Sequence, residues 1–117
     1  MDVITTHLEA EFDSFAAMVA AKRLYPEARL VFSGSQEKAL RDYLKASPRR
    51  FAVQRLRTLD LGEVTRLILV DTRRRDRIGP FGEVAARRGV EVHVYDHHPP
   101  SPQDVTASLA VVEEVGA

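Results

Sequence analysis

Imidazole and carboxylate side chains follow directly after three apolar segments of this chain. The residues are His7, Glu11, Asp13, Asp71, Asp96, His97 and His98. A mixture of imidazole nitrogen and carboxylate oxygen suits Mn²⁺, Fe²⁺, Co²⁺ or Zn²⁺, whereas sites built from oxygen alone suit Mg²⁺ or Ca²⁺. The residue types therefore predict a site for a divalent metal ion.

The spacing of these residues is compatible with two ions. His7, Glu11 and Asp13 form an H-x-x-x-E-x-D pattern on one loop that enters a helix, and Asp71 projects from a neighbouring segment, where it could bridge two ions. Two ions about 3.5–4 Å apart lower the pKa of a water between them and stabilise both the attacking and the leaving oxygen of a phosphoryl transfer. That chemistry requires no serine or cysteine nucleophile, and the chain has no cysteine.

Each residue taken alone also has a simpler interpretation. His7 could be a hydrogen-bonded loop residue, and Asp13 could cap the helix that follows. Asp71 could close a turn, and His97 and His98, which precede two prolines, could belong to a polar loop. Their joint position after three apolar segments is what favours the metal hypothesis.

The segments that position these residues alternate between strand and helix patterns. We expect strands at residues 2–6, 28–32, 66–71 and 90–95, a short strand within 51–59 and a further one at 105–109. Helices are expected at residues 14–24, 36–46 and 79–88, and the start of another element at 111–115. The last helix should end at Gly89. Such alternation predicts an α/β fold, with a Rossmann-like parallel sheet and helices on both faces. Ligands bind at the carboxyl ends of the strands in sheets of this kind.

Composition and charge narrow the functional classes. A chain of 117 residues suits one domain, and the absence of cysteine excludes disulfides and thiolate metal sites. No apolar run is long enough for a membrane span and no signal peptide is evident, so we expect a cytoplasmic protein without membrane contact. The formal net charge is zero, but residues 41–89 hold thirteen Lys and Arg against six Asp and Glu. These are either solvated faces or a basic rim that attracts a phosphate-bearing substrate.

Three motifs resemble those of the DHH phosphoesterase superfamily. They are T-H-L-E-A-E-F-D at residues 6–13, L-V-D-T at 69–72 and Y-D-H-H-P at 95–99. The superfamily includes RecJ exonucleases, nanoRNases and pAp phosphatases, family II inorganic pyrophosphatases and exopolyphosphatase-like proteins. Residues 12–26 and 32–44 are similar to one branch, in which a DHH domain precedes CBS domains and a poly(A)-polymerase-type nucleotidyltransferase.

The resemblance implies a parallel α/β domain that holds two Mn²⁺ ions, with Co²⁺ or Mg²⁺ as alternatives, and hydrolyses phosphodiester or phosphoanhydride bonds. By motif position, His7 and Glu11 would hold one ion, Asp13 and His97 the other, and Asp71 would bridge them. The substrate would be a nucleotide, a short oligonucleotide (RNA included) or polyphosphate.

Three further residues have roles beside the ions. The resemblance implies that His98 contacts a substrate phosphate and that Asp96 orients the histidine pair, so that both act in catalysis. From its charge alone, Arg73 is expected to bind substrate by neutralising phosphate.

The chain departs from the superfamily pattern at two points. Glu11 stands where the first aspartate of a D-x-D pair is usual, and the aspartate of a fourth, downstream motif is not found. We therefore expect residues 1–117 to be a single DHH-type domain from the N-terminal part of a longer protein, prone to form homo-oligomers. The departures leave an alternative open, a non-catalytic module that binds nucleotide or RNA and supports an attached tRNA nucleotidyltransferase. A plain nucleotide-binding domain has little support, because no glycine-rich phosphate-binding motif is present.

Overall fold

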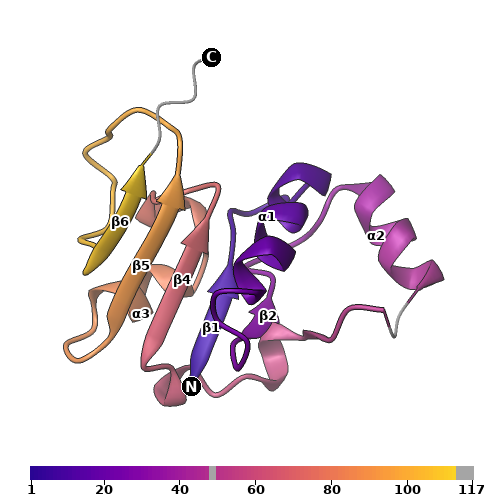
Figure 1. Cartoon of the computed structure of the whole chain (residues 1–117), viewed down its shortest axis with the longest axis horizontal. Coiled ribbons are helices and arrows are strands. Elements are labelled where there is room, and N and C mark those ends of the chain that lie inside the picture. Colours follow the sequence, from indigo (N-terminus) through magenta and orange to yellow (C-terminus); the bar gives the residue numbers. More distant parts are fainter. Residues whose placement is uncertain (48–49, 113–117) are drawn as a thin grey trace.

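Six parallel strands form one sheet in the computed structural model, which describes residues 1–47 and 50–112 (Figure 1). The strands are β1 (Asp2–Thr5), β2 (Arg29–Val31), β3 (Val53–Gln54), β4 (Arg66–Val70), β5 (Glu91–Asp96) and β6 (Leu109–Val112). They lie in the order β3-β2-β1-β4-β5-β6. This arrangement confirms the predicted α/β fold with a parallel sheet.

Helices cover both faces of the sheet. They are α1 (Phe12–Lys22), α2 (Lys38–Ala46) and α3 (Phe81–Ala86), with 3₁₀ turns η1 (Leu56–Thr58), η2 (Leu61–Glu63) and η3 (Arg75–Arg77). The side of α1 and α2 buries one core cluster, which includes Phe15 and Met18, and the side of α3 buries another, which includes Phe81. No helix among the described residues is long and apolar enough to cross a membrane.

The central strand β4 is almost entirely apolar because both of its faces are buried. Leu67 and Leu69 pack in the core cluster beside α3, whereas Ile68 and Val70 pack in the cluster beside α1. A strand that is covered on both faces reads as a continuous apolar run. Its buried position in turn fixes Asp71 at the middle of the carboxyl edge.

The strand order places a topological switch point between β1 and β4. From β1 the chain continues outward through β2 and β3, and from β4 it continues outward in the other direction through β5 and β6. The connections from two such neighbouring strands leave toward opposite faces, which opens a crevice at their carboxyl ends. Pairing of Thr5 with Leu69 brings the loops that contain His7 and Asp71 to this point.

Helix α1 begins earlier than the sequence suggests. Its N-cap is Glu11 rather than Asp13. The Ser14 hydroxyl accepts from the Glu11 N–H at 2.9 Å and donates to the Glu11 carbonyl oxygen at 2.9 Å. Ser14 therefore stabilises the helix start from inside the first turn.

Helix α3 is shorter than the predicted span of residues 79–88. Gly79 has a φ of +53°, and a Cβ there would lie 2.7 Å from the Ser33 carbonyl oxygen, so this residue cannot belong to a helix. The helix ends at Ala86, before Gly89, whose φ is +88°.

The last strand also differs from its predicted position. Residue Val105 donates its N–H to the Arg73 carbonyl oxygen at 2.7 Å, so the expected strand at 105–109 instead packs on the loop after β4. Strand β6 begins at Leu109, after Ser108 has paired with Val92. An element expected at 111–115 corresponds to the end of β6, and its residues 113–115 lie outside the described part.

Candidate metal centre

A cleft of about 270 Å³ lies at the carboxyl ends of β1, β4 and β5, at the switch point of the sheet. The residues that line it are His7, Glu11, Asp71, Thr72, Arg73, Arg74, Arg77, Asp96, His98, Pro99 and Asp104. The polar residues that follow the three predicted strands therefore meet at the carboxyl edge of the sheet, as the sequence predicts.

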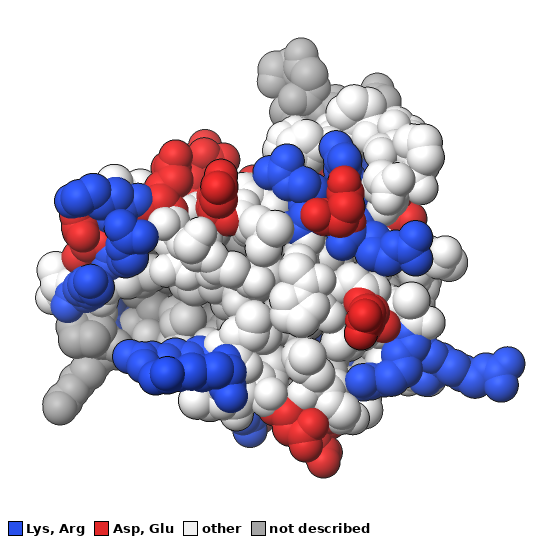
Figure 2. Space-filling model, turned by 180° about the vertical axis from the view of Figure 1, so that it is seen from behind, with Lys and Arg blue, Asp and Glu red and all other residues white. Residues whose placement is uncertain are grey.

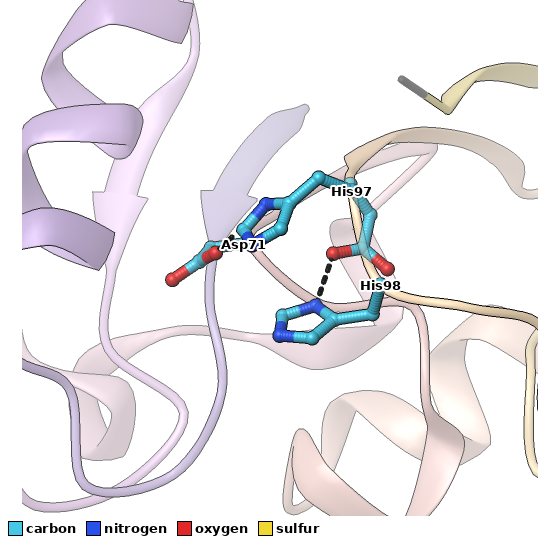
Figure 3. Close-up of side chains that lie close together, drawn as sticks. Asp71, His97 and His98 are labelled. Atoms are coloured by element: carbon cyan, nitrogen blue, oxygen red, sulfur yellow. Dashed lines mark hydrogen bonds and ion pairs between the residues drawn. The ribbon is translucent and has the colours of Figure 1, made fainter. Parts of the chain in front are cut away.

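Asp71 is at the centre of this arrangement. Its Oδ2 lies 3.6 Å from His7 Nε2. Its Oδ1 lies 3.6 Å from His97 Nδ1, as Figure 3 shows for these two residues. Both separations exceed an ordinary hydrogen bond, so the two oxygens face the two rings without closing on either. The backbone of Asp71 has a φ of +59°, which few residues other than glycine, asparagine and aspartate tolerate. Its N–H donates to the Tyr95 carbonyl oxygen at 2.9 Å, which holds this turn in place.

His7 is oriented by its own loop. Its Nδ1 lies 2.7 Å from the Leu8 carbonyl oxygen, which only an N–H can satisfy, so Nε2 is left as the nitrogen that faces Asp71. The Asp71 carboxylate raises the pKa of His7, and the His7 ring holds the pKa of Asp71 below its ordinary value. Asp71 is therefore anionic at neutral pH, as a metal ligand must be.

The ligand atoms converge in two groups that share one member. One group contains His7, Glu11 and Asp71, and in each group the ligand atoms lie within 4.8 Å of one another. The other group contains Asp71, Asp96, His97 and His98. Two sets of nitrogen and oxygen donors with a common carboxylate fit a pair of divalent ions.

His97 and His98 (Figure 3) form a compact unit with Asp96. His98 Nδ1 lies 2.6 Å from Asp96 Oδ1, and the Asp96 side chain is only 1% exposed. The His97 and His98 rings stack with their centroids 4.4 Å apart. The buried carboxylate therefore orients an exposed histidine pair.

The side chains of Glu11 and Asp13 do not both face the cleft. Glu11 lines the cleft, whereas Asp13 is exposed in the first turn of α1 and belongs to neither ligand group. Two residues along a helix are about 200° apart around its axis, so a helix that starts at Phe12 turns Asp13 away from Glu11. The structure thus brings together six of the seven predicted residues.

Arg73 has carboxylate partners within the protein. Its Nε lies 3.0 Å from Asp104 Oδ2 and 3.7 Å from Asp96 Oδ2, and its Nη2 donates to the His98 carbonyl oxygen at 2.9 Å. The arginine is 11% exposed. It therefore links the loop after β4 to the loop after β5, although it still lines the cleft.

Asp104 and Arg77 were missed by the sequence reasoning. Asp104 reaches the cleft because residues 101–105 fold back on the loop after β4, a contact that no local pattern indicates. Arg77 is exposed on the cleft wall and has no carboxylate within 4 Å in the described ranges. By contrast, Arg74 is paired with Asp76. A surplus of arginine in residues 72–78 was the available signal.

No protein-family model matches this chain. The sequence is 53% identical over 118 residues to part of an A-adding tRNA nucleotidyltransferase of Geobacter sulfurreducens. The alignment covers the whole chain but only 13% of that protein's length.

The structure is similar to the crystal structure of an exopolyphosphatase-related protein from Bacteroides fragilis, with a TM-score of 0.72. The two share 14% sequence identity, and the match covers 97% of this chain and 34% of the other. This likeness establishes the fold. The metal and the reaction have to be inferred from the residues of the site.

Proposed function

We propose that this chain is a DHH-type, metal-dependent phosphoesterase domain that hydrolyses phosphodiester or phosphoanhydride bonds. The observation that carries the proposal is the Asp71 carboxylate, whose two oxygens face His7 and His97 in two separate ligand groups. Likeness in fold to an exopolyphosphatase-related protein supports it.

The donors fit a pair of Mn²⁺ ions, with Co²⁺ or Mg²⁺ as alternatives. His7 and Glu11 would hold one ion, His97 the other, and Asp71 both; Asp13 would need to turn toward the cleft to contribute. The mixed nitrogen and oxygen donors favour Mn²⁺ or Co²⁺ over Mg²⁺. When bound, such ions supply an activated water at neutral pH and offset the charge that develops on the phosphoryl oxygens.

The remaining residues bind and orient the phosphate. Because His98 Nδ1 is engaged by Asp96, its Nε2 is available to a phosphate oxygen. Arg77, which has no carboxylate within 4 Å among residues 1–47 and 50–112, provides a cation on the wall of the cleft for a substrate anion. Arg73, which we expected to bind substrate, is better placed to hold the loops of Asp96 and Asp104 in position.

The proposal is tested by hydrolysis assays with Mn²⁺ on pyrophosphate, polyphosphate and a short RNA. The unmodified chain should release product from at least one of these, and Asp71→Asn should abolish the release. Asp42→Asn, an exposed aspartate on α2, is the matched control and should retain full activity. Equal activity of Asp71→Asn and the unmodified chain would overturn the proposal.

A second candidate is a non-catalytic module that binds RNA or nucleotide beside a tRNA nucleotidyltransferase. Sequence identity of 53% to part of such an enzyme favours it, as does the outward position of Asp13. Under this hypothesis the chain binds tRNA in the presence of Mn²⁺ and leaves all three substrates intact.

A further inference from the structure

A second cavity, of about 500 Å³, lies beyond the carboxyl ends of β2 and β3 and beside α2. The residues that line it are Phe32, Gly34, Gln36, Arg41, Leu44, Lys45, Ser47, Phe51, Val53, Gln54, Arg55 and Leu56. None of them lines the cleft around Asp71. We call this cavity the α2 pocket.

Two kinds of surface meet in the α2 pocket. Its apolar part is built from Phe32, Leu44, Phe51, Val53 and Leu56, and its cations are Arg41, Lys45 and Arg55. In Figure 2, where α2 is at the left-hand edge, Lys and Arg side chains lie above and below the left-hand part of the molecule. In residues 1–47 and 50–112, none of these three cations has a carboxylate within ion-pair distance. The pocket therefore presents unpaired positive charge beside apolar surface.

We propose that the α2 pocket binds a nucleotide unit, with its phosphate at Arg41, Lys45 and Arg55 and its base on the apolar surface. An inorganic polyphosphate would satisfy the cations but would leave Leu44 and Phe51 without a partner. An apolar ligand would leave the cations without one. A cationic groove with apolar and aromatic surface is the usual combination for single-stranded nucleic acid. The volume lies within the roughly 300–1,000 Å³ typical of organic ligand pockets.

The loop at residues 33–36 separates the α2 pocket from the candidate metal centre. Gly34 lines the pocket and is so close to Leu8, next to His7, that a Cβ on Gly34 would lie 2.6 Å from Leu8 Cδ2. On the same loop, Ser35 accepts from the Ala10 N–H at 3.1 Å. Both cavities open at the carboxyl edge of one sheet. An RNA strand with one nucleotide in the α2 pocket therefore extends toward the cleft around Asp71. This inference rests on the proposed function, and it selects nucleic acid over polyphosphate as the substrate class of the metal centre.

The test separates binding from hydrolysis. A short RNA labelled with fluorescein is titrated with the chain in EDTA, and binding is followed by fluorescence anisotropy. The double variant R41A/R55A should bind at least about tenfold more weakly, since each substitution removes a charged phosphate contact. Arg88→Ala, an exposed arginine after α3, is the matched control and should bind as the unmodified chain does.

Competition with unlabelled ligands tests the nucleotide class directly. An unlabelled RNA should displace the probe, and a polyphosphate of equal charge should displace it much less well. Displacement by AMP would assign the pocket to a free nucleotide, and displacement by RNA alone would assign it to a strand. Unchanged binding by R41A/R55A, equal competition by polyphosphate, or no RNA binding at all would overturn the proposal. Hydrolysis that survives in R41A/R55A would leave the phosphoesterase hypothesis intact.

Discussion

Two histidine clusters, one within strand β5 and one directly after it, differ in how completely their polar atoms are paired. Within the strand, His93 Nδ1 lies 2.6 Å from the Tyr25 hydroxyl, and His93 Nε2 lies 3.2 Å from Glu91 Oε2. The same Tyr25 hydroxyl lies 2.7 Å from that of Tyr95. After the strand, by contrast, His97 has a carboxylate only at 3.6 Å and is half exposed.

This contrast distinguishes a structural network from a candidate site. Both clusters combine imidazole with carboxylate, so residue type does not separate them. In the first, each hydrogen-bonding atom of the His93 ring has a partner within the protein, and burial raises the pKa of Tyr25 so that its hydroxyl stays protonated. In the second, Asp71, His7 and His98 line a cavity at the switch point, and the ligand atom of His97 converges with those of Asp71 and His98. Ligand atoms that face a cavity mark the site.

Arg73 lines the cleft, but like the residues around His93 it is paired with groups of the protein itself. Its substitution should therefore have the largest effect on stability. Arg73→Ala leaves the buried carboxylate of Asp96 and the nearby Asp104 without their cation. We expect the free energy of unfolding to fall by about 3 kcal/mol, as when one partner of a buried ion pair is removed. Urea denaturation measures this, with exposed Arg88→Ala as the control. A change no larger than that of Arg88→Ala would show that the cluster contributes nothing to stability.

Asp96→Asn should weaken metal binding while the fold persists. The amide cannot serve as a negatively charged acceptor for His98 Nδ1, so the histidine pair loses its orientation. Loss of a group that orients ligands typically costs about 10–100-fold in metal affinity. Calorimetric titration with Mn²⁺ measures the change. An unaltered affinity would mean that the D-H-H loop is held without Asp96.

In contrast to Asp96→Asn, Tyr25→Phe should lower the stability of the fold and leave metal binding unchanged. The substitution removes the hydroxyl shared by His93 and Tyr95 and leaves a half-buried imidazole nitrogen without a partner. We expect a loss of about 1 kcal/mol in the free energy of unfolding and no change in Mn²⁺ affinity. If Mn²⁺ affinity fell as well, the two clusters would be coupled and the contrast between them would fail.

The smallest expected effect is a pH dependence of stability without added metal. The raised pKa of His7 gives a stabilisation that is complete below the ordinary value of 6.5 and is lost as the pH rises through the raised value. The lowered pKa of Asp71 gives a stabilisation that is present above its ordinary value of 3.8 and is lost as the pH falls through the lowered value. The pair should therefore stabilise the fold most between these two ordinary values. Urea midpoints in EDTA should fall between pH 6 and 8 in the unmodified chain more than in His7→Gln; parallel profiles would contradict this.

The parallel sheet was predictable because its signals are local. The apolar run of β4 and the alternation in β5 each indicate a strand, and parallel strands place Asp71 and His97 at one edge. The residue types at that edge were enough to propose a metal centre before any spatial arrangement was known.

Other features depend on contacts that no local pattern contains. The partners of Arg73 come from the loops that hold Asp96 and Asp104, and the return of residues 101–105 onto the loop after β4 displaces the predicted final strand. The direction of Asp13 depends on the residue at which α1 begins, which Ser14 decides. A shift of one or two residues in a helix start is enough to turn a ligand toward or away from the cleft.

The central claim is that Asp71 joins two metal positions, and calorimetric titration with Mn²⁺ tests it most directly. Asparagine tolerates the positive φ of residue 71, so Asp71→Asn changes the charge and one ligand atom while the turn is kept. We predict that the unmodified chain and the Asp42→Asn control bind two ions and that Asp71→Asn binds fewer, and more weakly. Two ions bound equally well by Asp71→Asn, or no ion bound by the folded, unmodified chain, would contradict the claim.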